Sequence, residues 1–388
     1  MSHFSMPEHV LTGKNALSEA VPYLKTYGKR AFIVTGKHVG SSPMMEQLKK
    51  TLESAEIASY VFDEITGEPT DRMIEEGVRL YRQTNCSFCI GIGGGSPMDA
   101  AKAIAVMVEK DGRLRDYAGK EIRQDAGKIF PPVAAIPTTA GTGSEMTKFT
   151  VITDLECKAK LLLKGECLLP RLAIVDPDFS MDMPKSVTAA TGLDALTHAI
   201  EAYTSKKAFA LTDIFAVSAV KRIMKYLPIA YRNGYDAEAR EQMSLAAMEA
   251  GICINNSSVT LVHGMSRPIG ALFHVPHGKS NAMLLKECLS FALEGTYERF
   301  GYLGRETGVA QAEESDREAA EKFLQKVEEL CRICEIPTLR EYGIEEKDFY
   351  GAADKMAEDA MASGSPGNTV RKVTKEDCIT IYKKAYET

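Results

Sequence analysis

Four residues whose side chains bind metals stand out in the sequence: Asp194, His198, His263 and His277. Asp194 and His198 lie four residues apart in TGLDALTHAIEAY, a run of helical period, so both should leave the same face of one helix. His263 and His277 come from TLVHGMSRPIGALFHVPHG, where the Pro-His-Gly turn delivers His277 from a separate element. Three imidazoles and one carboxylate from two segments predict a site for one divalent cation.

The alternative is that these histidines are ordinary buried residues, which is the commoner role of a single histidine on an apolar helix face. The chain has only seven histidines, and four of them, His198, His263, His274 and His277, lie within 80 residues. This clustering beside Asp194 favours the metal site. Imidazole and carboxylate ligands suit Fe²⁺, Zn²⁺ or Mn²⁺, and ligand type alone does not choose among them.

Length and composition limit the class of protein. The chain has 388 residues, of which 45% are hydrophobic and 26% charged, enough for two globular domains with their own cores. The net charge of −6 gives no basic field for nucleic acid, and no run of about 18 apolar residues predicts a membrane span. The N-terminus, MSHFSMPEHV, lacks the pattern of a signal peptide, so we expect a cytoplasmic protein whose nine cysteines are reduced.

The sequence changes character near residue 180. Before it, short β-rich runs such as RAFIVTG, SFCIGIG and VAAIPTT alternate with helical stretches such as MMEQLKKTLESA. Strands separated by helices predict a parallel sheet covered by helices, so residues 1–180 are expected to form a Rossmann-like α/β domain that binds a nucleotide. After it, apolar residues recur at helical spacing, so residues 181–388 are expected to form an all-helical domain that carries the metal ligands.

Two glycine-rich loops in the α/β half carry the nucleotide prediction. The first follows the strand-like CSFCIGI and consists of Gly93, Gly94, Gly95 and Ser96. Ser96 as a cap, followed by proline, predicts a helix start, where free backbone amides can hold a diphosphate. Asp99 is expected to serve the capping box rather than the ligand, because a carboxylate would repel phosphate. The second loop, PTTAGTGSE, also follows a predicted strand, as expected for a ligand along the strand ends of an open sheet. Two tight structural turns are the alternative.

Four blocks, in the order GGGSPMDAAK, PTTAGTGSE, GLDALTHAIEAY and VHGMSRPIGALFHVPHG, resemble the iron-containing alcohol dehydrogenases, also called group III. The resemblance runs from about residue 5 to the C-terminus. It implies a nucleotide-binding α/β domain, a helical domain and a metal in the cleft between them, an architecture shared with dehydroquinate synthase. It also implies NAD(H) or NADP(H) as cofactor and a homodimer or higher homo-oligomer.

The resemblance assigns roles to individual residues. The family's metal ligands fall on Asp194, His198, His263 and His277. Its diphosphate loop falls on Gly93, Gly94, Gly95 and Ser96, its second cofactor loop on Thr138, Thr139 and Thr142, and a lysine near the cofactor ribose on Lys160. These roles imply hydride transfer between NAD(P)H and a small aldehyde whose oxygen is polarised by the metal.

One departure from the family concerns substrate. Many relatives have a second histidine one helical turn after the third ligand, where this chain has Arg267. A guanidinium does not relay protons near neutral pH, but it can clamp a sulfonate, phosphonate or carboxylate, and family members that reduce sulfoacetaldehyde or phosphonoacetaldehyde make such a substrate reasonable. The alternative is a structural arginine paired to a buried acid. His274, one turn before the fourth ligand, is a candidate proton relay or else a surface imidazole.

A second departure concerns the cofactor. Some NAD-preferring relatives have aspartate at the position of Gly36, where a carboxylate would hold the adenosine ribose and repel a 2′-phosphate. Gly36 removes that repulsion, and Lys37 and His38 follow it, either as phosphate ligands or as solvated loop charges. NADP use is therefore permitted but not required.

Other functions stay open at this point. The enzyme could be a general dehydrogenase of uncharged short-chain alcohols or diols. The two-domain plan also resembles zinc-dependent glycerol dehydrogenase and dehydroquinate synthase, a lyase that uses NAD only transiently. A metal-binding protein without catalytic activity is disfavoured, because it would not need two nucleotide loops.

Overall fold

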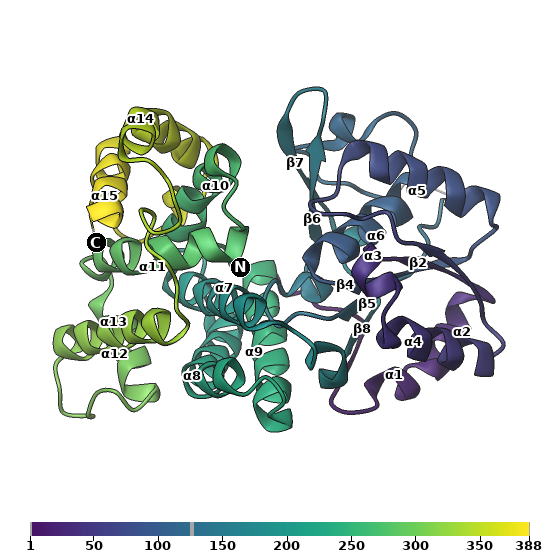
Figure 1. Cartoon of the computed structure of the whole chain (residues 1–388), viewed down its shortest axis with the longest axis horizontal. Coiled ribbons are helices and arrows are strands. Elements are labelled where there is room, and N and C mark those ends of the chain that lie inside the picture. Colours follow the sequence, from purple (N-terminus) through teal and green to yellow (C-terminus); the bar gives the residue numbers. More distant parts are fainter. Residues whose placement is uncertain (1, 125–127, 388) are drawn as a thin grey trace. The chain divides into compact units, whose positions relative to one another are not determined.

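The computed structural model describes residues 2–124 and 128–387. They fall into two compact units, one spanning Ser5–Asp182 and the other Met183–Thr388 with the first few residues of the chain, Met1–Phe4 (Figure 1). The first unit is a parallel sheet with helices and the second is helical. The predicted fold class, α/β followed by all-α, is therefore confirmed.

A six-stranded parallel sheet forms the centre of the first unit. Its strand order is β1-β8-β5-β4-β2-β3, with β1 at His9–Thr12, β2 at Arg30–Val34, β3 at Ala58–Phe62, β4 at Phe88–Gly93, β5 at Val133–Pro137 and β8 at Leu172–Val175. Strands β4, β5 and β8 are buried along their whole length, as apolar runs in a parallel sheet covered on both faces should be. The runs RAFIVTG, SFCIGIG and VAAIPTT are β2, β4 and β5, as predicted.

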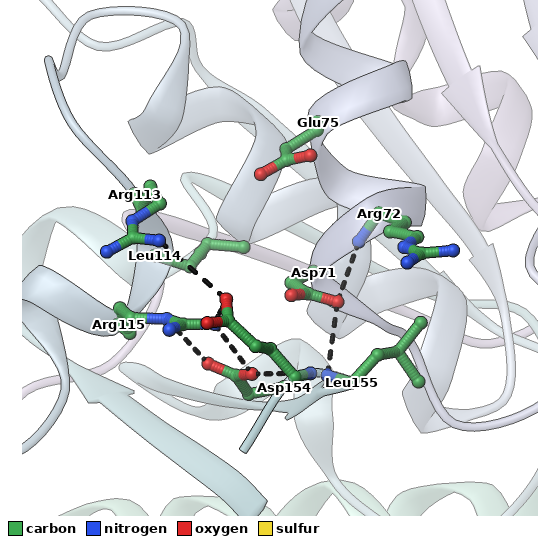
Figure 2. Close-up of a pocket in the computed structure, with 9 residues that line it drawn as sticks. Asp71, Arg72, Glu75, Arg113, Leu114, Arg115, Asp154 and Leu155 are labelled. Carbon is green, nitrogen blue, oxygen red and sulfur yellow. Dashed lines mark hydrogen bonds and ion pairs between the residues drawn. The ribbon is translucent and has the colours of Figure 1, made fainter. Parts of the chain in front are cut away.

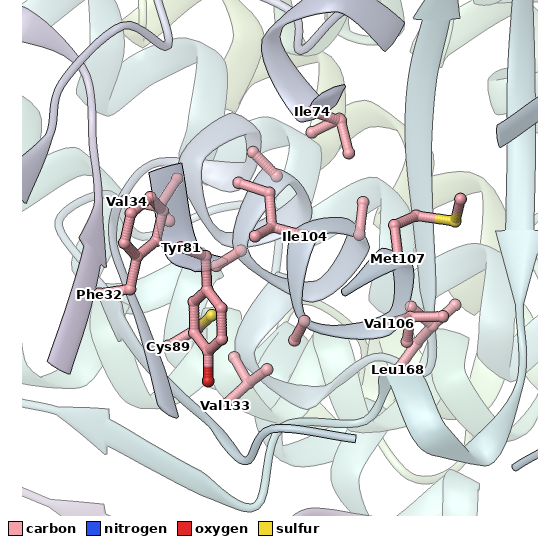
Figure 3. Close-up of a cluster of buried hydrophobic side chains, with 14 of the residues drawn as sticks. Phe32, Val34, Ile74, Tyr81, Cys89, Ile104, Val106, Met107, Val133 and Leu168 are labelled. Atoms are coloured by element: carbon pink, nitrogen blue, oxygen red, sulfur yellow. The ribbon is translucent and has the colours of Figure 1, made fainter. Parts of the chain in front are cut away.

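The two faces of this sheet pack against different helices. These are α1 (Ala16–Glu19), α2 (Val21–Tyr27), α3 (Lys37–Gly40), α4 (Pro43–Ser54), α5 (Asp71–Gln83) and α6 (Gly95–Met107). Along β2, Phe32 joins one core with Ile74 of α5 and Ile104 of α6, shown in Figure 3, whereas Ile33 joins a second core with Leu48 of α4. Successive side chains of a strand point to opposite faces, so one apolar run supplies both cores.

An antiparallel hairpin and short 3₁₀ turns complete the first unit. The hairpin strands are β6 (Phe149–Asp154) and β7 (Ala159–Lys164), and the turns are η1 (Leu114–Tyr117), η2 (Ser144–Met146), η3 (Glu166–Leu168) and η4 (Pro177–Ser180). The sequence analysis does not identify the hairpin. β7 has only one buried residue, so its pattern lacks the clear apolar face that marks a core strand.

The described part of the second unit contains helices and no strand. They are α7 (Lys185–Thr204), α8 (Ala210–Arg232), α9 (Ala237–Asn256), α10 (Leu261–Phe273), α11 (His277–Leu293), α12 (Tyr297–Glu306), α13 (Asp316–Ile333), α14 (Glu346–Ala362), α15 (Lys375–Glu387) and the 3₁₀ turn η5 (Pro366–Asn368). Helix α7 is buried over most of its length and packs against α8, α9 and α11. It is therefore a fixed element from which side chains can be positioned.

No single helix among the described residues has both the length and the apolarity needed to cross a membrane. Helices α9 and α10 pass such a test only when taken together, and the chain bends by 101° between them.

Candidate functional site

Three of the four predicted metal ligands come together in the helical unit. Asp194 Oδ1 lies 3.5 Å from His263 Nε2 and 3.7 Å from His277 Nε2, and the three ligand atoms all lie within 4.8 Å of one another. They come from three helices, α7, α10 and α11. The turn predicted before His277 exists, because Pro276 caps the start of α11 and His277 is its first residue.

The close approach of α11 to α7 depends on a glycine. A Cβ atom at Gly278 would lie 2.4 Å from the carbonyl oxygen of Ala190 in α7, a distance that no real side chain tolerates. Glycine at this position therefore lets the start of α11 meet α7 directly. That contact brings His277 beside Asp194.

The donor set and its spacing fit a divalent cation. With bonds of about 2.1 Å to nitrogen and oxygen, a tetrahedral ion needs donors about 3.4 Å apart, close to the two distances above. The site also has the charge that a cation requires. Burial alone would raise the pKa of the Asp194 carboxyl, but the imidazoles of His198, His277 and His263 together hold it well below its usual range.

The fourth predicted ligand, His198, lies beside this group rather than within it. Its ring stacks on the ring of His263 with centroids 4.5 Å apart and an angle of 18° between the ring planes. His198 is buried on α7, one turn after Asp194, as its spacing predicts. Its assignment as a metal ligand stays a prediction.

Two residues of the metal centre are missing from the sequence predictions. Asn281, one turn after His277 on α11, places Nδ2 2.7 Å from Asp194 Oδ1, 3.1 Å from His263 Nε2 and 3.3 Å from His277 Nε2. Its Oδ1 is buried without a hydrogen-bond partner among the described residues. A single amide therefore contacts all three ligand groups.

Glu201 is the second missed residue. It is fully buried on α7, and its Oε2 lies 2.5 Å from Nδ1 of His263, on the opposite side of the ring from the other ligands. Burial alone would lower the pKa of His263, but Glu201 and Asp194 raise it to about 9 in the absence of a cation. The spacing of Asp194, His198 and Glu201, at i, i+4 and i+7, is the sequence signal that identifies it.

The two predicted catalytic residues lie on and just after α10. Arg267, one turn after His263, is exposed, and its Nη1 donates a hydrogen bond to Ser365 Oγ at 3.1 Å. Among the described residues it forms no ion pair with a carboxylate within 4.0 Å, but the buried Glu201 is close enough to act on its charge, so the structural alternative stays open. His274 follows the helix as its C-cap, exposed and in the left-handed conformation (φ 55°).

The predicted nucleotide loops lie side by side at the carboxyl edge of the sheet. Strands β4 and β5 are parallel neighbours, and the amide of Thr138 donates to the carbonyl of Gly93 at 2.8 Å. Gly93 has φ 146°, and a Cβ there would lie 2.8 Å from Pro97, so this turn requires glycine. A Cβ at Gly95 would lie 3.1 Å from Thr142, so the two loops touch.

The strand order gives this edge a further property. From β2 the chain passes to β3 on one side, and from β4 it passes to β5 on the other, so the order reverses between β2 and β4. Ligands of open α/β sheets bind at such a reversal, outside the carboxyl ends of the strands. Gly36 follows β2 and the Gly93–Ser96 loop follows β4, so both predicted cofactor segments flank this point.

The capping prediction for the first loop is wrong. Helix α6 starts at Gly95 with Gly94 as its N-cap, and no side chain caps it. Asp99 instead accepts hydrogen bonds from Ser144 Oγ at 2.6 Å and from the amide of Val151 at 2.9 Å. These partners lie 45 and 52 residues away in sequence, so a local capping rule cannot find them.

Behind the loops lies a buried lysine. Lys102 Nζ donates to Ser144 Oγ at 2.8 Å, to Thr147 Oγ1 at 2.9 Å and to the carbonyl of Phe149 at 3.2 Å. Asp99 Oδ1 lies 3.5 Å from the same nitrogen. Helix α6 is thereby tied to the segment that follows the second loop, and a buried charge with this many partners is satisfied.

The remaining cofactor residues have partners of their own. Lys160 Nζ forms an ion pair with Glu68 at 2.7 Å. A Cβ at Gly36 would lie 2.6 Å from the carbonyl oxygen of Ile65, so an aspartate at this position would require the backbone to shift. Lys37 and His38 are exposed, in agreement with solvated loop charges.

A separate polar pocket of about 440 Å³ lies between the start of α5, the turn η1 and the β6–β7 connection (Figure 2). Within it, Arg115 pairs with Asp154 at 2.9 Å and with Glu156 at 2.6 Å. None of the described residues lining it belongs to the two glycine-rich loops. Since its charges largely satisfy one another, this pocket is not the predicted nucleotide site.

Comparison with known proteins matches both units. The family model for iron-containing alcohol dehydrogenase matches residues 7–177, and that for the C-terminal part of the Fe-containing alcohol dehydrogenase family matches residues 188–386. The chain is 37% identical over 387 residues to the NAD-dependent methanol dehydrogenase of Bacillus methanolicus, covering 99% of this chain and 100% of that one.

Solved structures give the same result. A crystal structure of 1,3-propanediol oxidoreductase has a TM-score of 0.95 and 33% identity, with 99% of this chain and 100% of that chain covered. The sulfoacetaldehyde reductase of Bifidobacterium kashiwanohense, solved in complex with NAD⁺, has a TM-score of 0.87 and 27% identity, with 100% and 99% covered.

Proposed function

This chain belongs to the iron-containing alcohol dehydrogenase family and is an NAD(P)-dependent alcohol dehydrogenase, and we propose that its substrate is a small aldehyde bearing an anionic group. In the reductive direction the cofactor held by the α/β unit would supply a hydride for the carbonyl carbon, and a proton from solvent or a side chain would complete the alcohol. Sulfoacetaldehyde is the representative substrate. The observation that carries the proposal is the guanidinium of Arg267, one turn after His263 and with no carboxylate in ion-pair contact among the described residues.

The metal centre sets the reaction class. A divalent ion bound by Asp194, His263 and His277, with His198 as the fourth predicted ligand, would supply Lewis acidity toward the substrate oxygen. The protein's own part is to hold these ligands on three helices and to supply the negative charge of Asp194. The Nδ2 atom of Asn281 lies within 3.3 Å of the same three ligand atoms, for which a bound cation would compete.

The cofactor is assigned to the α/β unit. The loops Gly93–Ser96 and Thr138–Thr142 offer backbone amides and hydroxyls at the point where strand order reverses, which suits the diphosphate of a dinucleotide. Lys160 is proposed to contact the ribose from β7. Its pairing with Glu68 means that it brings little net charge, so it orients the ribose through hydrogen bonds rather than attracting phosphate.

Arg267 supports the anionic substrate through its surroundings. One of its nitrogens donates to a neutral partner, Ser365, and its charge is balanced only at a distance, by Glu201, with no carboxylate in ion-pair contact among the described residues. It lies on the same helix as His263 and close enough to His277 to influence the charge of that imidazole. A planar guanidinium with unused donors suits bidentate binding of sulfonate, phosphonate or carboxylate.

A second candidate is a general dehydrogenase of uncharged short-chain alcohols or diols. It is favoured by two of the relatives, whose names specify methanol and 1,3-propanediol. In that case Arg267 has a structural role through Ser365, and His274 or solvent supplies the proton.

The test compares two aldehydes of similar size and different charge. We would measure anaerobic oxidation of NADH and of NADPH by the iron-loaded enzyme with sulfoacetaldehyde and with butyraldehyde, for the unmodified chain and for Arg267→Leu. Loss of a bidentate charged contact should lower kcat/KM for sulfoacetaldehyde by about 100-fold, and that for butyraldehyde by less than about threefold. Running both cofactors in the same assay also settles their order of preference.

A matched control is Arg317→Leu, which removes an exposed arginine paired with Glu321 on α13. This variant should leave kcat/KM unchanged for both aldehydes. Equal losses on both aldehydes in Arg267→Leu, or a preference of the unmodified chain for butyraldehyde, would contradict the anionic substrate and favour the second candidate.

A further inference from the structure

Glu201 lies on the same face of α7 as Asp194 and His198, seven residues after the first and three after the second. Its side chain is fully buried. Among the described residues its only ion-pair partner within 4.0 Å is His263, and the guanidinium of Arg267 acts on its charge from further away. A buried carboxylate with no lysine or arginine in ion-pair contact carries a high desolvation cost, so its surroundings must provide a specific stabilisation.

Both oxygens of Glu201 are occupied, and each by a different part of one segment. Oε1 accepts hydrogen bonds from Thr260 Oγ1 at 2.8 Å and from the amide of Val262 at 2.6 Å. Oε2 lies 2.5 Å from Nδ1 of His263. The carboxylate therefore accepts hydrogen bonds from the start of α10 and from the ring of a predicted metal ligand at the same time.

The contacts of Oε1 replace a helix cap. Thr260 is the N-cap of α10 but makes no capping bond with its own side chain, since its hydroxyl is turned to Glu201. The amide of Val262, in the first turn, is satisfied by the same oxygen. A carboxylate from α7 thus caps α10. A helix N-terminus favours negative charge, and the cap fixes the position of His263 in the first turn.

The contact of Oε2 decides which ring nitrogen faces the ligands. A carboxylate can only accept, so Nδ1 of His263 carries a proton and donates it to Glu201. In the neutral ring, which is the form that binds a cation, Nε2 then keeps its lone pair, and it is this atom that lies 3.5 Å from Asp194 Oδ1. We propose that Glu201 is a positioning residue of the metal centre, which commits His263 to bind the cation through Nε2.

Charge balance supports the same role. Asp194 and Glu201 are two buried carboxylates on one helix face, and together they match the two charges of a divalent cation. His263 links them, with Nε2 toward one and Nδ1 toward the other. Such an outer carboxylate orients a histidine ligand and raises its basicity, and its loss typically costs about 10–100-fold in metal affinity.

The decisive variant is Glu201→Gln, which has the same shape but one donor and one acceptor. If its oxygen keeps the bonds from Thr260 and Val262, its NH₂ group faces Nδ1 of His263. Nδ1 must then accept, and the proton moves to Nε2, where it blocks the cation. The affinity for Co²⁺ or Zn²⁺, measured by competition with a chromophoric chelator, should fall about 10–100-fold, and Glu201→Asp, which keeps a carboxylate, should recover part of it.

A matched control is Glu249→Gln on α9. Glu249 is also a buried glutamate of the helical unit, bonded to Ser218 and Arg222 rather than to a metal ligand. It should leave metal affinity unchanged, although it removes a buried carboxylate in the same way. Thermal unfolding of both variants reports whether the fold is kept.

A second readout needs no variant of Glu201. In the Zn²⁺-loaded protein with isotope-labelled histidine, nitrogen spectra should show the ring of His263 protonated at Nδ1 and bound to the metal through Nε2. The assignment follows from the signal lost in His263→Gln. This readout stands even if Glu201→Gln does not fold.

The inference rests on the metal site but not on the choice of substrate, and both readouts are made without substrate or cofactor. Unchanged metal affinity in folded Glu201→Gln, or metal bound through Nδ1 of His263, would overturn it, and so would an unmodified chain that binds no divalent metal. Failure of the anionic-substrate assay would leave these readouts unaffected.

Discussion

Two buried glutamates show how differently the two halves of the molecule are built. In the metal centre, Glu201 has both oxygens hydrogen-bonded, and its pKa is held low: burial alone would raise it, but the imidazole of His263 and the donors from Thr260 outweigh that effect. Behind the nucleotide loops, Glu145 is equally buried, but its Oε2 has no hydrogen-bond partner among the described residues. Burial raises the pKa of Glu145 to about 7.

The difference reflects what each region must bind. A metal centre works through the identity and charge of side chains, so its carboxylates are kept ionised and fixed. A nucleotide loop works through backbone amides and open space, so glycines matter more than charge there. Changes to side-chain charge should therefore damage the first region most, and changes to backbone space the second.

The largest expected effect in the loops comes from adding one methyl group. In Gly94→Ala the new Cβ would meet nothing closer than 3.6 Å, at Thr139 Oγ1, so the fold should keep its stability. The methyl would still stand where a diphosphate must approach the backbone, and we expect the KM for the nicotinamide cofactor to rise about tenfold with metal content unchanged. Steady-state kinetics and metal analysis check both statements.

Gly351→Ala serves as the control for an added methyl group. Gly351 lies within α14, and a Cβ there would have no neighbour within 4 Å. It should leave the KM for cofactor unchanged and stabilise the helix by up to about 1 kcal/mol. An unchanged KM for the cofactor in Gly94→Ala would contradict the role assigned to backbone space in this loop, because the loop would then not be in contact with the cofactor.

A smaller effect should appear in the pH dependence of stability. An unfolded chain ionises Glu145 near its ordinary value of 4.5, whereas the folded protein keeps the proton up to about 7. The contribution of protonated Glu145 to the stability of the fold is therefore fully present below about pH 4.5 and is lost as the pH rises through about 7. Glu145→Gln, which cannot ionise, should gain about 5–10 °C in Tm relative to the unmodified chain between pH 5 and pH 8.

Burial lowers the pKa of Lys102, and the charges of Asp99 and Glu145 act against that effect, so the difference between the two chains reports Glu145 together with its interaction with Lys102. A Tm difference that stays constant across this pH range would mean that Glu145 ionises normally in the fold. The contrast with Glu201 would then fail.

Much of the fold could be predicted from the sequence, because its signals are local. The buried strands β2, β4 and β5 are continuous apolar runs, and α7 has helical period with its two predicted ligands one turn apart. The three ligands that come together belong to residue types and spacings that the sequence displays directly. The two loops predicted to bind a nucleotide are marked by glycine after a strand, which is a local signal.

What could not be predicted depends on contacts between distant segments. The sequence favours a local cap for Asp99, whereas its partners are Ser144 in η2 and Val151 in β6, both far away along the chain. The spacing of Glu201 places it on the helix face of Asp194 and His198, but its donors, Thr260 and Val262, are known only once α10 is placed against it. The homodimer implied by family resemblance stays a prediction.

The most direct test of the account is metal dependence. The protein should be depleted with a chelator and titrated anaerobically with Fe²⁺, while bound metal and the rate of NADH or NADPH oxidation are followed together, with Asp194→Ala as the variant lacking a ligand. We expect activity to rise in proportion to bound iron and to stop at one ion per chain, and Asp194→Ala to lose about 1,000-fold or more in rate. Full activity in the depleted protein, or in Asp194→Ala, would contradict the account.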